Sequence, residues 1–150
     1  MLSNKRIPKT KFYLMLIFTS ILILSISLES MFRAKDVSFF ENWIYINNII
    51  IDNEIDLNQA FNSYLVVILS TMFIKIVIPM ALSLYSYFAY TRIGINRMFI
   101  FIWSVLLLGG LGYELVGFNI GSIFFYINII VYISLILIIF SLNSVIDKSK

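Results

Sequence analysis

Four long apolar stretches, at about 12–30, 64–90, 99–117 and 120–142, occupy more than half of this 150-residue chain. A helix needs about 20 residues to cross a hydrocarbon core of about 30 Å, and each stretch is that long or nearly so. The apolar residues come in blocks rather than at amphipathic spacing, so we expect them to face lipid as well as each other. The sequence therefore predicts an all-α integral membrane protein, with four transmembrane helices in an antiparallel bundle.

The composition excludes several kinds of chemistry. The chain is 61% hydrophobic and 13% charged, whereas a soluble domain is usually about 25% charged. It has no Cys and no His, which excludes disulfides, Cys or His metal sites, His-ligated haem and His general-base catalysis. The basic residues form no stripe on one face, so no nucleic-acid partner is expected. We expect a single membrane domain at 1–150, with no catalytic residues, no cofactor and no metal.

The distribution of Lys and Arg predicts the orientation, because short loops rich in these residues stay in the cytoplasm. Eight of the eleven Lys and Arg residues lie in the segments 1–11, 91–98 and 143–150. The 31–63 segment has two, together with five of the eight acidic residues. We therefore predict a cytoplasmic N-terminus (1–11), a cytoplasmic tail (143–150) and an extracytoplasmic 31–63 loop. The frequent Ile, Asn and Lys residues are typical of an AT-rich bacterial genome, so a bacterial cytoplasmic membrane is expected.

The first apolar stretch also resembles a signal peptide, with a basic start and the small-residue sequence Ser25-Ile26-Ser27 at its end. Typical signal peptides have apolar cores of about 7–15 residues. The run here continues beyond that length, which favours a retained anchor. Cleavage would leave three spans and an extracytoplasmic N-terminus.

The 31–63 loop contains a helical pattern of apolar residues. Phe39, Trp43, Ile46 and Ile50 follow the spacing i, i+4, i+7, i+11, which places them on one face of a helix. One interpretation is an amphipathic helix in the outer interface, with this face among the lipid headgroups. The alternative is a short helix packed on the outer end of the bundle.

Alternating carboxylates at 52–56 resemble the first half of a calcium-binding loop. The EF-hand pattern requires Gly at its sixth position and Glu at its twelfth, where this chain has Leu57 and Ser63. The pattern therefore fails. We expect Asp56 instead to be the N-cap of a helix that begins at Leu57.

The second predicted span holds two unusual residues, Lys75 and Pro79. Pro79 removes the backbone hydrogen bond to the carbonyl of Lys75, so a kink is expected there. Lys75 lies in an apolar run, and a Lys at the centre of a bilayer costs about 3 kcal/mol or more on insertion scales. Such a residue is expected to have either a partner or a function.

Small and polar residues mark the third and fourth spans. Gly109, Gly110 and Gly112 favour close helix packing, with local unwinding as the alternative. Glu114 follows near the outer end of the third span, and Asn128 lies about two turns into the fourth. A single Asn in a span usually bonds a neighbouring helix.

Lys75 and Glu114 are expected to lie in neighbouring spans, because successive helices usually pack together. A pair between them, with Asn128 or Glu29 nearby, is therefore geometrically possible. Three interpretations of Lys75 stay open: a structural pair or lone snorkelling, part of an ion or substrate path, or a contact with another subunit.

These features predict a small, non-catalytic membrane protein that acts by protein–protein interaction. It would be an accessory subunit of a membrane transport or secretion complex, or an immunity-type protein against a membrane-active peptide. Its expected partners are the lipid bilayer and other membrane subunits or copies of itself. The alternative is a homo-oligomeric small transporter, channel or holin-like pore that uses Lys75 and Glu114.

Overall fold

The structure is a computed structural model that describes residues 6–116 and 121–147. These residues form six α-helices: α1 (Lys9–Lys35), α2 (Val37–Ile46), α3 (Glu54–Phe88), α4 (Arg97–Val116), α5 (Ile123–Ser141) and α6 (Asn143–Asp147). A π-helical segment, η1 (Ala89–Ile93), continues α3. Within the described residues, the four segments long and apolar enough to cross a membrane are α1, α3 with η1, α4, and α5 with α6. The predicted all-helical structure with four helices long and apolar enough to cross a membrane is confirmed, whereas the antiparallel arrangement and the orientation stay predictions.

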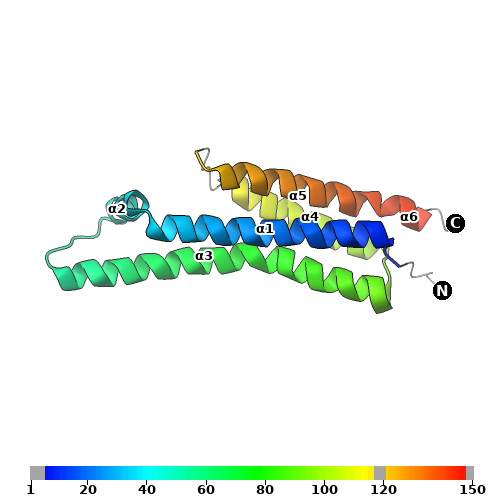
Figure 1. The fold of residues 1–150 in the computed structure, drawn as a ribbon, viewed down its shortest axis with the longest axis horizontal. Helices are drawn as coiled ribbons and strands as arrows, with labels where there is room; N and C mark the ends of the chain where they lie inside the picture. Colours follow the sequence, from blue (N-terminus) through cyan, green and yellow to red (C-terminus); the bar gives the residue numbers. More distant parts are fainter. Residues whose placement is uncertain (1–5, 117–120, 148–150) are drawn as a thin grey trace.

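The long helices lie side by side, with α1 in contact with both α3 and α5 (Figure 1). The ring of Phe12, near the start of α1, stacks on Tyr90 of η1 with centroids 4.4 Å apart. At the other end of α1, the Tyr64 hydroxyl donates a hydrogen bond to the carbonyl of Arg33 at 2.6 Å. The beginning of α1 therefore meets the end of the α3–η1 segment, and the end of α1 meets the first part of α3.

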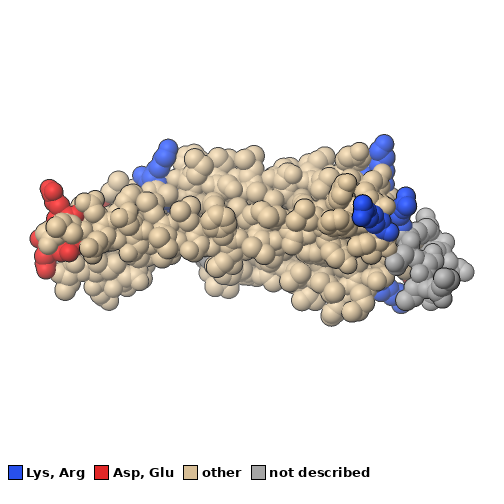
Figure 2. Space-filling model, turned by 90° about the horizontal axis from the view of Figure 1, so that it is seen from below, with Lys and Arg blue, Asp and Glu red and all other residues tan. Residues whose placement is uncertain are grey.

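Charge is distributed unevenly along the molecule. Acidic side chains gather at one tip, and basic side chains gather mainly at the opposite end (Figure 2). The name "acidic tip" is used below for Asp52, Glu54 and Asp56, and "basic end" for the end that holds Lys9, Arg92 and Arg97.

The α3 helix is much longer than the other spans. With η1 it has 40 residues, or about 60 Å at a rise of about 1.5 Å per residue. Its first part, together with α2, extends beyond the ends of α1, α4 and α5, and the helix bends along its length (Figure 1). Pro79 lies inside α3, but the kink expected at that residue stays a prediction.

The helices continue beyond the predicted spans. Helix α1 continues to Lys35 and α3 begins at Glu54, so residues 36–53 join the two helices, within the predicted 31–63 loop. The predicted N-cap at Asp56 is wrong, because the side chain of Asn53 accepts the N–H of Asp56 at 2.9 Å and starts the helix earlier. Asp56 instead lies in the first turn, where a carboxylate is favoured by the helix dipole. Gly117, at the end of the third predicted span, and Ile120, at the start of the fourth, lie outside the described residues.

The predicted apolar face of the loop helix is wrong at one residue, because Ile50 lies outside the helix. Helix α2 ends at Ile46, and Asn48 has a positive φ of 51°, so Ile50 follows a change of chain direction. Phe39 and Ile46 are exposed. Trp43 is the one residue of the predicted face that packs inward.

Aromatic packing on α3 decides which side of α2 is covered. The ring of Phe40 lies 5.3 Å from each of the rings of Phe61 and Tyr64, and the Trp43 ring lies 5.7 Å from that of Tyr64. These contacts correspond to the packed-helix alternative, in which α2 rests on another part of the bundle.

Asp36 caps the start of α2. Its carboxylate accepts hydrogen bonds from the Ser38 hydroxyl at 2.6 Å and from the Ser38 N–H at 2.9 Å. These bonds, the hydroxyl first, hold the pKa of the Asp36 carboxyl below its ordinary value. The cap is therefore complete while Asp36 is ionised, and it weakens as pH falls through the lowered pKa.

Candidate functional site

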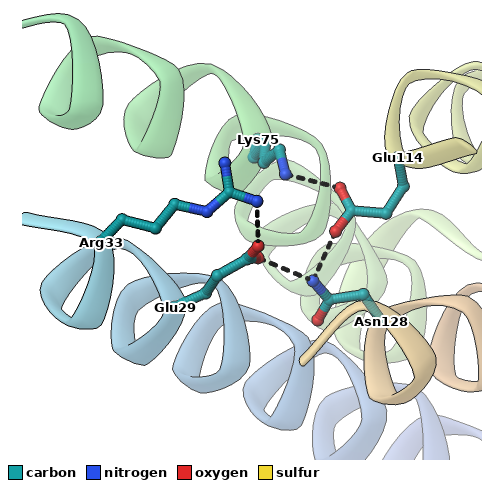
Figure 3. Close-up of polar contacts among 5 residues, drawn as sticks. All are labelled: Glu29, Arg33, Lys75, Glu114 and Asn128. Atoms are coloured by element: carbon teal, nitrogen blue, oxygen red, sulfur yellow. Dashed lines mark hydrogen bonds and ion pairs between the residues drawn. The ribbon is translucent and has the colours of Figure 1, made fainter. Parts of the chain in front are cut away.

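Five polar side chains from all four long helices meet in one cluster (Figure 3). The name "polar cluster" is used below for Glu29 and Arg33 of α1, Lys75 of α3, Glu114 of α4 and Asn128 of α5. Glu114 lies in the last turn of α4 and Arg33 in the last turn of α1. The cluster therefore lies toward the ends of these helices that are farther from the basic end.

Two ion pairs form the two sides of the polar cluster. Lys75 Nζ lies 2.7 Å from Glu114 Oε2, and Arg33 Nη2 lies 2.6 Å from Glu29 Oε1. Asn128 Nδ2 donates to Glu114 Oε1 at 2.6 Å and lies 3.5 Å from Glu29 Oε2. Because 3.5 Å is at the limit for a hydrogen bond, Asn128 binds Glu114 strongly and Glu29 weakly.

The carboxylates are more deeply buried than the cations. The side chains of Glu114 and Glu29 are 3% and 7% exposed, whereas those of Lys75 and Arg33 are 15% and 30% exposed. The ring of Tyr113 lies 5.9 Å from Lys75 Nζ and adds a cation–π contact. Two negative and two positive charges cancel, so the cluster is neutral as a whole, which is the arrangement that a low-dielectric environment requires.

The local sequence explains part of this geometry. Glu29 and Arg33 are four residues apart on α1 and therefore face the same side of the helix. Lys75 comes from an apolar part of α3, and its flexible chain lets its amine reach a neighbouring helix. Asn128 is fully buried, and its Oδ1 atom has no hydrogen-bond partner among the described residues.

Two cavities adjoin the polar cluster. One, of about 200 Å³, is lined by all four charged side chains together with Thr71. The other, of about 550 Å³, shares Glu29 and Arg33 with it and is also lined by Phe32 and Phe39. The charged groups are therefore reached from the side of the molecule where α1 ends.

No charged residue lies on the spans between the polar cluster and the basic end. The segments 12–28, 76–91, 98–113 and 121–146 contain no Lys, Arg, Asp or Glu. Met15, Leu22, Leu107 and Leu135 lie in these segments and are fully buried. The described interior therefore has a charged region at one end and an uncharged, largely apolar core beyond it.

The predicted Lys75–Glu114 pair is present, and Asn128 and Glu29 both lie beside it. Lys75 is paired within its own chain, so it does not need a second subunit to neutralise it. Arg33 was not expected in the cluster, because it was assigned to the loop after the first span. Its spacing of four residues from Glu29 was the available signal, since oppositely charged residues at this spacing usually pair on one helix.

The three glycines of α4 differ in their surroundings. A Cβ atom added at Gly110 would lie 2.8 Å from both Cε1 and Oη of Tyr132 on α5. Added at Gly109 or Gly112, it would meet nothing within 4 Å. Helix α4 is continuous through all three, so close packing applies at Gly110 and the unwinding alternative is wrong.

The chemistry available to the polar cluster is limited. Within residues 6–116 and 121–147, no group of three or more His, Cys, Asp or Glu side chains is placed to hold a metal ion. Each buried carboxylate is paired with a cation, Glu114 with Lys75 and Glu29 with Arg33. The arrangement is suited to joining helices and to binding a polar group at the open side.

Comparisons with protein-family models, with curated proteins and with solved structures found no match for this chain.

Proposed function

We propose that the four long helices cross a bacterial cytoplasmic membrane as an antiparallel bundle, with both termini in the cytoplasm. The contacts that join the start of α1 to η1, and the end of α1 to the first part of α3, support opposite directions for these helices. The basic end then lies on the cytoplasmic side, in agreement with the positive-inside rule. The acidic tip, α2 and the polar cluster lie toward the outer side.

This orientation can be tested because the natural chain contains no Cys. Asn42 of α2 and Asn143 of α6 are both exposed and lie at opposite ends. In intact cells, we expect a membrane-impermeant maleimide to label Asn42→Cys and not Asn143→Cys. After permeabilisation, both variants should be labelled. Labelling of Asn143→Cys alone in intact cells would reverse the proposed orientation.

We also propose that the protein is non-catalytic and acts by binding another membrane component at its outer side. The observation that carries this proposal is the one-sided position of the polar cluster, with cavities beside it and an uncharged, largely apolar interior beyond it. A path for a charged solute inside one chain would need charged groups that continue across the bundle. The buried polar side chains described beyond the cluster are uncharged hydroxyls, those of Thr19, Ser25, Ser86 and Ser104. An accessory subunit or an immunity-type protein needs only an exposed binding surface.

Co-purification in mild detergent tests this proposal. Tyr45 and Ile46 on α2 are 81% and 66% exposed, so replacing both with Ala removes surface without disturbing the fold. The matched control is the pair Phe101→Ala and Ile102→Ala on α4, which are also exposed. We expect a stoichiometric partner that is lost with the α2 variant and kept with the α4 variant.

A different outcome would favour the transporter alternative. It would be supported by a homo-oligomer that the α2 variant leaves intact and that conducts ions in liposomes. Loss of this conductance in Lys75→Leu would assign the path to the polar cluster and contradict the binding proposal.

A further inference from the structure

The outer surface of α2 and the residues after it form a groove that the polar cluster does not share. The groove is shallow and open, with a volume of about 650 Å³. It is lined by Glu41, Ile44, Tyr45, Asn48, Ile49 and Ile50.

This groove lies beside the part of α3 that projects from the bundle. Helix α3 with η1 is about 60 Å long, about twice the thickness of a hydrocarbon core. Its apolar part begins near Tyr64, so α2 and residues 54–63 extend beyond the ends of the other long helices (Figure 1). Apolar side chains at this level face water or headgroups, unlike the lipid-facing side chains of the spans.

Two of the groove residues are highly exposed, whereas Ile44 and Ile49 are half-buried. Ile50 and Tyr45 are 80% and 81% exposed, and the neighbouring Ile55 is 68% exposed. Contiguous apolar side chains outside the hydrocarbon region mark interaction sites more often than isolated ones do.

The charges around the groove select the kind of partner. Residues 36–74 contain no Lys or Arg, whereas Glu41 lines the groove and the acidic tip follows it in the chain. Figure 2 shows acidic side chains gathered at this tip of the molecule. This field repels an anionic lipid surface and attracts a cationic partner.

We propose that this groove binds a basic, amphipathic peptide segment. An apolar side chain of the segment would enter between Tyr45 and Ile50, while Lys or Arg side chains would pair with Glu41 and the acidic tip. This inference rests on the proposed function and specifies the chemistry of the partner. It follows the helix-in-groove mode of recognition, with charge supplying selectivity.

The test uses the full chain in nanodiscs of neutral phosphatidylcholine, with an environment-sensitive fluorophore on Asn42→Cys. The probe is a synthetic 18-residue Leu/Lys amphipathic peptide, and a Leu/Glu peptide of equal length is the charge control. Two controls detect binding of the peptides to lipid alone. One is Asn143→Cys with the same fluorophore, at the basic end, and the other is empty nanodiscs. We expect a saturable response of Asn42→Cys to the Leu/Lys peptide alone, weakened by high salt.

Two variants separate the contributions of charge and groove. Neutralising the acidic tip with Asp52→Asn, Glu54→Gln and Asp56→Asn is expected to weaken binding roughly tenfold or more. Ile50→Ser is expected to weaken it at both low and high salt, because it removes an apolar contact. Asp147→Asn, at the basic end, is the matched charge control and should leave binding unchanged.

Equal responses from the two labelled positions, or from the two peptides, would overturn the inference. If the co-purifying partner depends on α2 but the basic peptide does not bind, the partner chemistry inferred here is wrong while the proposed function stands. A partner that does not depend on α2 would overturn the groove inference and leave the proposed function standing, whereas the absence of any co-purifying partner would contradict the proposed function.

Discussion

Glu114→Leu is expected to destabilise the fold by about 3–5 kcal/mol, because it leaves the amine of Lys75 without its carboxylate in a largely buried position. It also removes the 2.6 Å hydrogen bond that Glu114 accepts from Asn128. The free energy of unfolding is measured in mixed detergent micelles, with circular dichroism as the probe of helix content.

The double variant Lys75→Leu/Glu114→Leu provides the decisive comparison. Replacing a buried ion pair with apolar side chains is often neutral or stabilising, so the double variant should recover most of the lost stability. The coupling energy from the double-mutant cycle then isolates the pair. Additive effects of the two single substitutions would contradict the pairing and favour a Lys75 that snorkels alone.

Function provides a second readout for the same variants. If the pair only joins α3 to α4, the stable double variant should retain partner binding. Loss of binding in a double variant that folds normally would assign the polar cluster a direct role in recognition.

Gly110→Ala is expected to destabilise the fold by about 1–3 kcal/mol through overpacking. The added Cβ would lie 2.8 Å from the ring of Tyr132. Tyr132 as a whole is 2% exposed, so its ring has no open space to swing into. Separation of α4 from α5 is then the remaining way to relieve the clash.

The neighbouring glycines supply matched controls for this substitution. Gly109→Ala and Gly112→Ala make the same change on the same helix, but their Cβ atoms would meet nothing within 4 Å. Both should be neutral or slightly stabilising, since Ala favours the helix more than Gly does. Unfolding midpoints of the three variants in one detergent would check this. Equal losses at all three positions would show that helix propensity or flexibility, rather than the Tyr132 contact, determines the effect.

The helix boundaries show where sequence reasoning fails. The predicted start of the second span followed the apolar run, but the helix itself begins at Glu54 because Asn53 supplies the cap. Hydropathy identifies the residues that are stable in the hydrocarbon core, whereas the N-cap residue determines where the hydrogen bonds of the helix begin. The two criteria place the start ten residues apart, at Glu54 and at Tyr64. The residues between them include Phe61, whose ring packs against Phe40 of α2.

The candidate site could be predicted in part. Lys75 and Glu114 were identifiable because charges inside apolar runs are costly, and their helices were expected to be neighbours. Arg33 was missed because the end of the first span could not be located. The spacing in the loop left two alternatives for its helix, an interfacial position or packing on the bundle, and the contacts of Phe40 and Trp43 with Phe61 and Tyr64 correspond to packing.

The sequence by itself determined the helical class, the four candidate spans, the absence of Cys and His chemistry and the separation of acidic from basic segments. These properties follow from local composition and from the free energy of placing each side chain in lipid or water. Tertiary structure alone decided that Asn128 lies between Glu114 and Glu29 and donates a hydrogen bond to Glu114. It also decided that the Tyr132 ring packs against Gly110, and not against Gly109 or Gly112. Finally, it decided which side of α2 is covered. These outcomes depend on how the helices are rotated and positioned relative to one another, which is fixed by contacts between residues far apart in the chain.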